Sequence, residues 1–360
     1  MLIALDSNRD CGAWINMRKP RIHLFALGGT IAARPGKRGM KVGLGADDLL
    51  RAVPDLDAIA DIRAETVSRS PSSDLLLDDL YALAVRIQAM ADAGESDAVV
   101  VTQGTNTLEE TAFLFDLVLR VDIPAVMTAA MRNPKLISPD GPGNVLAAVR
   151  VAAAPWTKAS AVGVLVAMLD QVWAAVDIAK TQTSRLDAFC SPSTGPVATL
   201  VEDRVIPLML PVREWKRALQ RYVDSAPAPQ FTSKSGPVAL LWLALGEQGA
   251  LLDSLLSDPG HLGYGGVVLG AMGGGHVPEK LVKRLADLAA RLPVVVASRT
   301  GGGPLLRQTY EGPGSEMALR SCGLIYAGRL PPLKARLLLD LLLRAGIDRT
   351  EMAAMFDVCS

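Results

Sequence analysis

Two apolar segments of strand length, each ending in glycine and threonine, constrain the fold of this chain most. The first, 22–33, reads Ile-His-Leu-Phe-Ala-Leu-Gly-Gly-Thr-Ile-Ala-Ala, and the second, 98–116, passes through Thr-Gln-Gly-Thr-Asn-Thr into an amphipathic helix. A strand that breaks at glycine and continues as a helix presents backbone N–H groups and hydroxyls at the carboxyl edge of a parallel sheet. We therefore expect Thr30 and Thr105 to converge on one substrate.

Strands alternate with helices along residues 21–206, which predicts a parallel sheet with helices on both faces. The alternation stops in the proline-rich, polar range 207–235 and resumes in shorter form over 236–360. At 360 residues the chain exceeds the usual size of a single core. We predict an N-terminal domain with a doubly wound, mostly parallel sheet, a linker, and a smaller C-terminal flavodoxin- or Rossmann-like α/β domain. Residues 1–20 are expected to form a disordered extension.

Composition excludes several classes of partner. Lys plus Arg and Asp plus Glu each number 37, giving a formal net charge of +0 with scattered basic residues, so neither nucleic acid nor a membrane is expected as a partner. The glycine-rich turn 270–278 lacks Gly-x-Gly-x-x-Gly, so we expect no nucleotide cofactor. The start of the chain shows no signal-peptide pattern, which favours the cytoplasm. Four cysteines without metal-ligand spacing fit reduced thiols or one disulfide, and no metal site is expected: Cys11, Cys190, Cys322 and Cys359.

The chemistry of a threonine nucleophile requires a neighbouring base and donors for an oxyanion. A Ser/His/Asp triad is not favoured, because the chain has only three histidines and no Gly-x-Ser-x-Gly elbow. Lysine and carboxylate remain as bases. Lys180 is the candidate, since it follows Asp177 by three positions and precedes a run of hydroxyl residues. The alternative is that Lys180 is an ordinary surface charge.

These motifs, in this order, resemble those of the bacterial-type asparaginase and glutaminase family. Gly-Gly-Thr-Ile-Ala at 28–32 and Gly-Thr-Asn-Thr-Leu-Glu-Glu-Thr at 104–111 resemble the two threonine signatures. Further similarities are Ser-Ser-Asp at 72–74, Asp-Ile-Ala-Lys-Thr at 177–181, Ser-Arg-Thr-Gly-Gly-Gly at 298–303 and Leu-Lys-Ala-Arg at 333–336. The resemblance implies a cofactor-free amidohydrolase that assembles as a homodimer or homotetramer. It also implies a small-molecule amide substrate, with L-asparagine as the default.

The resemblance assigns roles to individual residues. Thr30 takes the position of the nucleophile, while Thr105 and Lys180 take those of a proton relay. Ser72 matches the serine that holds the substrate carboxylate, although a serine between a strand and a helix is also a common N-cap. His276 lies in a loop that reaches the neighbouring subunit's site in family dimers, or it only precedes the next helix. The remaining expected substrate-binding residues are Gly29, Ser73, Gly104 and Asn106.

The sequence departs from the family pattern at two places. Asn106 replaces an aspartate that accepts the substrate α-ammonium, so a charge-assisted hydrogen bond is lost and the pKa of Lys180 is expected to fall. No tyrosine follows Thr30 before Tyr81, and Gly39 or Met40 takes the place of the family's lid tyrosine. The surrounding loop, 34–45, is a lid or a solvated connection. Two alternatives stay open: action on another amide in a specialised biosynthetic pathway, and a catalytically silenced binding protein.

Overall fold

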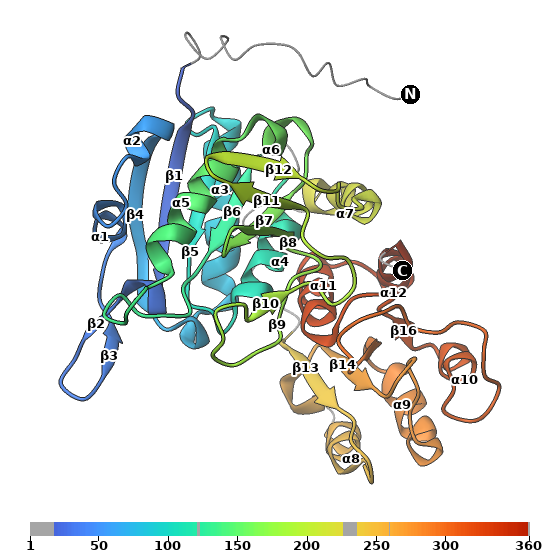
Figure 1. Cartoon of the computed structure of the whole chain (residues 1–360). Helices are drawn as coiled ribbons and strands as arrows, with labels where there is room; N and C mark the ends of the chain where they lie inside the picture. The colour runs from blue at the N-terminus through green and yellow to red at the C-terminus, as the bar shows by residue number, and fades with distance from the viewer. Residues whose placement is uncertain (1–17, 121–122, 226–235, 259, 359–360) are drawn as a thin grey trace.

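Short apolar runs form the centre of the N-terminal sheet (Figure 1). The computed structural model describes residues 18–120, 123–225, 236–258 and 260–358. Within these residues eight strands pair in the order β12-β11-β8-β7-β6-β5-β1-β4. The five at one side are parallel, namely β1 (Arg21–Gly28), β4 (Asp61–Ser70), β5 (Ala98–Thr102), β6 (Ala125–Thr128) and β7 (Val164–Met168). The others pair antiparallel, namely β8 (Gln171–Ala174), β11 (Ala198–Val201) and β12 (Arg204–Pro207).

Helices cover both faces of this sheet, which explains why β5, β6 and β7 are apolar and buried along their whole length. Helices α3 (Leu77–Asp92) and α4 (Leu108–Val118) pack together on one face, and α2 (Leu56–Ile59) and α5 (Gly141–Ala153) on the other (Figure 1). The predicted doubly wound domain is confirmed. The shorter helices are α1 (Ala46–Arg51) and α6 (Pro155–Ala159).

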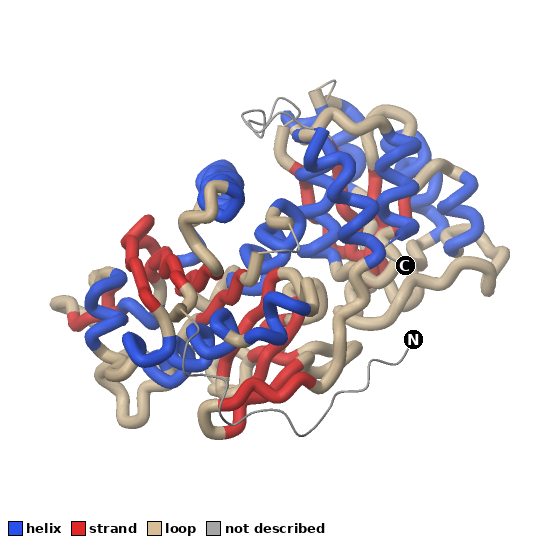
Figure 2. Tube along the Cα trace, turned by 90° about the horizontal axis from the view of Figure 1, so that it is seen from above, coloured by secondary structure: helices blue, strands red, loops and turns tan. Residues whose placement is uncertain are grey.

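The C-terminal unit is a second α/β layer structure with its own sheet, as predicted (Figure 2). Its parallel strands lie in chain order, namely β13 (Val238–Trp242), β14 (Gly266–Ala271), β15 (Val294–Ser298) and β16 (Ile325–Tyr326). Its helices are α8 (Ala250–Ser257), α9 (Val282–Ala289), α10 (Glu316–Ser321), α11 (Pro332–Arg344) and α12 (Arg349–Val358). Two short 3-10 turns, η5 (His261–Gly263) and η6 (Glu279–Leu281), complete this unit.

The range 207–235 is more than the linker that its prolines predict, because it contains helix α7 (Glu214–Ser225). This helix packs against α4 and α12. Trp215 is 2% exposed and lies 5.9 Å from Phe113, ring centroid to ring centroid. Arg213 donates two hydrogen bonds of 2.8 Å to the buried carboxylate of Asp116. A long-range ion pair and a buried indole therefore anchor this segment. Residues 226–235 lie outside the described residues.

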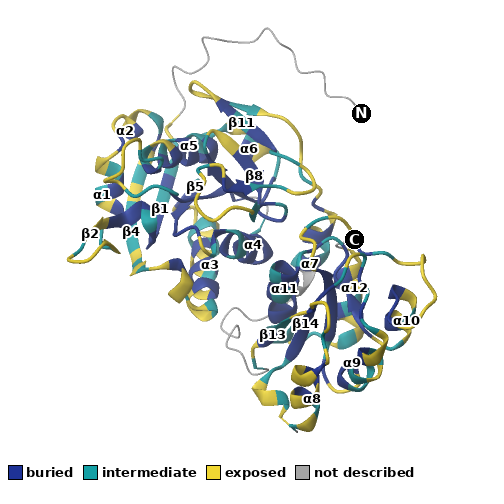
Figure 3. Ribbon diagram, turned by 60° about the horizontal axis from the view of Figure 1, so that its bottom comes forward, coloured by how far each residue is buried: buried dark blue, intermediate teal, exposed yellow. Residues whose placement is uncertain are grey.

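Helix α11 joins the two units. Its leucines are buried on several sides, and it contacts α4 of the N-terminal unit as well as β13, β14 and β15. Figure 3 shows the buried residues continuing through both sheets and this helix. The largest hydrophobic cluster accordingly includes residues from both units, such as Val100, Val268 and Leu338. The two sheets share part of one core.

Several sequence expectations fall partly outside the described residues. The expected extension, 1–20, is described only from residue 18 onward. Cys190 and Cys322 carry free thiols, while Cys11 and Cys359 lie outside the described part of the chain. None of the described helices combines the length and the hydropathy that a membrane span needs.

Candidate active site

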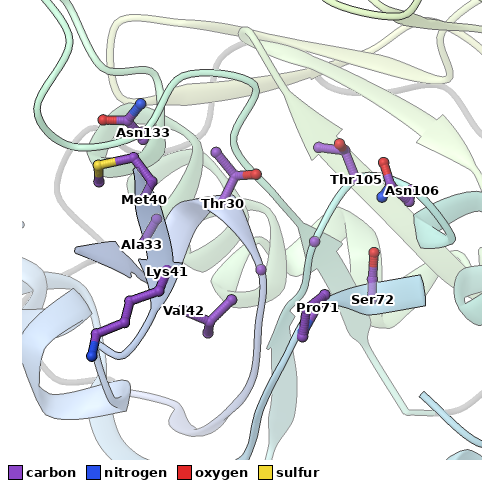
Figure 4. Close-up of a pocket in the computed structure, with 12 residues that line it drawn as sticks. Thr30, Ala33, Met40, Lys41, Val42, Pro71, Ser72, Thr105, Asn106 and Asn133 are labelled. Carbon is purple, nitrogen blue, oxygen red and sulfur yellow. The ribbon is translucent and has the colours of Figure 1, made fainter. Parts of the chain in front are cut away.

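Three neighbouring parallel strands bring the predicted hydroxyl residues to one edge of the N-terminal sheet. Strand β4 pairs with one side of β1, and the later strand β5 pairs with its other side. The strand order therefore reverses at β1, and this is a switch point of the sheet. Thr30 follows β1, Ser72 follows β4, and Thr105 follows β5. They border a cavity of about 200 Å³ (Figure 4). Its lining comprises Gly29, Thr30, Ala33, Met40, Lys41, Val42, Pro71, Ser72, Gly104, Thr105, Asn106 and Asn133.

Two glycines allow the threonine turns to approach each other. Gly29 has a φ of 85°, and a Cβ at this position would lie 2.2 Å from the Cα of Gly104. A Cβ at Gly104 would in turn lie 2.8 Å from the Oγ of Ser72. Only glycine satisfies both the left-handed backbone at residue 29 and this spacing. The glycine-threonine pattern therefore sets the distance between the loops that carry Thr30 and Thr105.

Lys180 reaches Thr105 from the short strand β9 (Ala179–Lys180), which pairs with β10 (Phe189–Cys190). Its Nζ donates to the Oγ1 of Thr105 at 2.8 Å. Burial lowers the pKa of Lys180, and the nearby carboxylate of Glu109 opposes this shift. A lysine with a lowered pKa loses its proton more easily and can accept one from a hydroxyl. Lys180 is therefore not a surface charge.

The Ser72 loop is tied to the second threonine turn. The hydroxyl of Thr107 donates to the carbonyl of Ser72 at 2.9 Å, and the side-chain amide of Gln103 donates to that hydroxyl at 3.0 Å. Ser72 is 3% exposed and lies in the 3-10 turn η3 (Ser72–Asp74). The N-cap of α3 is Leu76, so Ser72 does not cap that helix. Ser73 is exposed and bonds Asp74, outside the cavity lining.

A hairpin covers the cavity beside Thr30. It consists of β2 (Ala33–Pro35) and β3 (Met40–Val42) after the 3-10 turn η2 (Thr30–Ala32). All three residues of β3 line the cavity, so the segment is part of the site as well as a solvated connection. Of the two residues expected in place of the family's lid tyrosine, Gly39 and Met40, Met40 lines the cavity. Lys41 extends away from the threonines (Figure 4). Asn133 completes the lining, and no sequence signal pointed to it.

His276 lies in the C-terminal unit, away from the cavity of its own chain. Its Nε2 is 3.1 Å from the buried carboxylate of Glu316, and its ring meets that of Tyr310 edge-on with centroids 5.1 Å apart. The structure does not bring His276 together with the other predicted site residues. Among the described residues no group of three or more histidine, cysteine or acidic side chains could hold a metal ion.

Both units match known sequence families. Residues 21–209 match the model described as "Asparaginase, N-terminal", and residues 237–356 match the "Glutaminase/Asparaginase C-terminal domain". The chain belongs to the asparaginase family. A probable L-asparaginase from Deinococcus radiodurans is 34% identical over 94% of this chain and 97% of the relative. L-asparaginase 2 from Escherichia coli is 32% identical over 94% and 93% of the two chains.

A solved structure supports the same assignment. The crystal structure of a probable cytoplasmic L-asparaginase from Campylobacter jejuni superposes with a TM-score of 0.81 at 30% identity, covering 94% of this chain and 99% of that one. Membership of the asparaginase family makes the protein an amidohydrolase. The cavity that Thr30 and Thr105 line, with Lys180 bonded to Thr105 behind it, is the candidate site for this chemistry.

In this member of the asparaginase family, the C-terminal unit also holds the segment that delivers Lys180. Nζ of Lys334, on α11, donates to the carbonyl oxygens of Val176 at 2.9 Å and Ile178 at 2.6 Å. Arg329 donates to Asp177, the residue between them, at 3.0 Å. These contacts join residues more than 150 positions apart, so spacing did not reveal them. The only signal was the Leu-Lys-Ala-Arg motif.

Because Lys334 is buried, we expect the free energy of unfolding to depend on pH in an unusual way. Burial lowers the pKa of Lys334 to about 8 in the folded protein, against 10.5 for the ordinary side chain. Between these values the unfolded chain binds the proton and the folded chain does not, so the free energy of unfolding rises with pH. From pH 7.5 to 9.5 we expect a gain of about 2 kcal/mol relative to Lys334→Met. Urea unfolding of both proteins at the two pH values measures it.

The exposed Lys158 provides a control for this measurement. Lys158→Met also removes one lysine, and we expect it to unfold in parallel with the unmodified protein at both pH values. If Lys334→Met ran parallel to the unmodified protein as well, the buried amine would not be the source of the pH dependence.

Proposed function

We propose that the protein hydrolyses the side-chain amide of a small, amino-acid-like substrate to a carboxylate and ammonia through a threonine acyl-enzyme. One observation carries the proposal: the amine of Lys180 lies 2.8 Å from the hydroxyl of Thr105, at a cavity that Thr30 also lines. L-asparagine is the default substrate, since the relatives are named L-asparaginases. A lysine beside a hydroxyl supplies the base that threonine chemistry requires.

The proposed reaction has two halves. In the first, the hydroxyl oxygen of Thr30 attacks the amide carbonyl carbon while Thr105 and Lys180 take up its proton. The carbon–nitrogen bond then breaks, and ammonia leaves with a proton returned through the same relay. In the second half, water attacks the ester and releases the carboxylate and Thr30. Backbone N–H groups of the glycine turns at Gly29 and Gly104 are proposed to contact the substrate carbonyl.

The remaining predicted residues are proposed to hold the substrate. Ser72 is assigned to the substrate carboxylate, because its buried hydroxyl is at the cavity wall. Asn106 is assigned to the substituent next to that carboxylate. His276 retains its proposed role as a contact, which requires a second copy of the chain to supply it. No contact is proposed for Ser73, because it lies outside the cavity lining.

We also propose that the protein works as a homodimer or homotetramer in the cytoplasm. The position of His276 in the C-terminal unit supports an assembly in which one copy completes the site of another. The neighbour from Campylobacter jejuni is titled cytoplasmic, which supports the compartment. Light scattering at micromolar concentration distinguishes a monomer from either assembly.

Ammonia release tests the hydrolytic function directly. Purified protein is supplied with L-asparagine, L-glutamine and D-asparagine, and hydroxylamine is added to intercept the acyl-enzyme. We expect ammonia from each amide that is hydrolysed and a hydroxamate when hydroxylamine is present, because ammonia leaves as the ester forms and hydroxylamine then attacks the ester. Ammonia without hydroxamate would contradict the acyl-enzyme. Ligand binding without ammonia from any amide would instead support a silenced binding protein.

A further inference from the structure

The cavity wall has no acidic side chain to receive a cation. Among the 12 lining residues, all of them in the described part of the chain, no aspartate or glutamate is present. Lys41 is the one charged residue of this set, and its amine points away from the two threonines (Figure 4). The groups that face the cavity are hydroxyls, amides and backbone. The part of the wall that this chain supplies is therefore neutral.

The ionisable group nearest to Thr105 behind that wall is an amine. Nζ of Lys180 lies 2.8 Å from the hydroxyl of Thr105. The acidic group beside it is Glu109, which does not line the cavity. Burial raises the pKa of Glu109, and the amine of Lys334 opposes that shift. The amine of Lys180 does not attract a substrate ammonium in either protonation state, and in its protonated state it attracts a carboxylate.

A substrate ammonium would lose water in this cavity without gaining an ionic partner among the lining residues of this chain. Removing a charge from water is unfavourable unless an opposite charge or several hydrogen bonds replace the hydration shell. A substrate carboxylate has both kinds of compensation, because the hydroxyl of Ser72 lines the cavity and Lys180 lies behind Thr105. The cavity therefore suits the carboxylate of an amino acid better than its ammonium.

Two asparagine side chains provide neutral hydrogen-bonding groups at the cavity wall. Asn106 and Asn133 both line the cavity. The Oδ1 of Asn133 accepts from the backbone of Lys135 at 3.0 Å, so its position is partly fixed. An amide offers one acceptor and two donors, which suits a neutral acylated nitrogen. Asn106 follows Thr105 in the chain and lines the same cavity.

We propose that the substrate is a small carboxamide that carries a carboxylate but no free α-ammonium, and that Asn106 determines this specificity. The α-position is either unsubstituted or bears an acylated nitrogen. The proposal rests on the hydrolytic function proposed above and narrows its default substrate. It follows from the absence of acidic residues in the described lining together with the position of Asn106 in this lining, beside Thr105.

The experiment compares three amides that differ only at the α-position: L-asparagine, N-acetyl-L-asparagine and succinamic acid. Ammonia release gives kcat/KM for each with the unmodified protein and with Asn106→Asp. We expect the unmodified protein to favour succinamic acid or N-acetyl-L-asparagine over L-asparagine by about tenfold or more. Asn106→Asp is expected to shift the ratio toward L-asparagine by about tenfold or more, because it supplies a carboxylate for the ammonium.

A second variant tests whether the position of the charge matters. Asn133→Asp adds a carboxylate to the same cavity at another point of its wall. We expect a smaller shift of the ratio than Asn106→Asp produces. Equal shifts in both variants would overturn the assignment of specificity to Asn106.

The results separate this inference from the hydrolytic function. If the unmodified protein hydrolysed L-asparagine as well as it hydrolysed the other two amides, the inference would be overturned and the hydrolytic function would stand. If no amide released ammonia, the hydrolytic function would fail. Calorimetric titration of the unmodified protein with the same three compounds would then still test the inference, and tighter binding of L-asparagine would overturn it.

Discussion

Thr30→Ala is expected to lower kcat for amide hydrolysis by on the order of 10⁴-fold or more, because it removes the atom that forms the ester. The effect on stability should be small, since Thr30 is only half-buried and the change deletes a hydroxyl and a methyl group at the cavity. Steady-state ammonia release measures the loss, and circular dichroism confirms that the variant is folded. Thr30→Ser keeps the hydroxyl and is expected to recover part of the rate.

Thr105→Ala is the matched variant at the other threonine. It removes the hydroxyl that Lys180 contacts, and we expect kcat to fall by about 10²- to 10⁴-fold, as for the loss of a proton-transfer group. Acid quenching followed by peptide mass mapping locates the ester. An acyl group on the peptide that contains Thr105 would make the lysine-bonded hydroxyl the nucleophile and contradict the assignment of Thr30.

The two threonine turns were predictable because their causes are local. Gly29 and Gly104 each follow a strand, and parallel strands end at one edge of a sheet. The sequence therefore indicated the edge and the residues Thr30 and Thr105, whereas the switch point became visible only in the strand order. The hairpin that contains Met40 was only a loop with two alternative roles, because its contact with the cavity depends on how the chain folds back after β2.

Long-range polar contacts account for most of what the sequence did not reveal. The range that contains helix α7 was predicted as linker, and the residue before this helix, Arg213, pairs with Asp116, 97 positions away. The contact of Lys334 with the segment before Lys180 is of the same kind. Burial of a charged residue is unfavourable unless a partner is supplied, and that partner is set by tertiary structure. Local periodicity contains no information about it.

Lys180→Met is expected to lower kcat by about 10³-fold, within the range for loss of a general base. The unmodified protein should also show kcat rising with pH at values below the ordinary pKa of lysine, because burial lowers the pKa of Lys180 and only the neutral amine accepts a proton. This rise should disappear in the methionine variant. The pH profile of ammonia release, measured in both proteins, tests the two expectations together.

Lys41→Met is the control, since Lys41 lines the same cavity with its amine directed away from the threonines (Figure 4). We expect it to keep the pH-dependent rise in kcat, because it leaves the hydrogen bond between Lys180 and Thr105 intact. Lys180→Arg separates charge from basicity. Arginine retains the positive charge but does not lose its proton, so it should be as inactive as methionine if Lys180 acts as a base. Full activity of Lys180→Arg would show instead that the cavity needs only a fixed positive charge at this position.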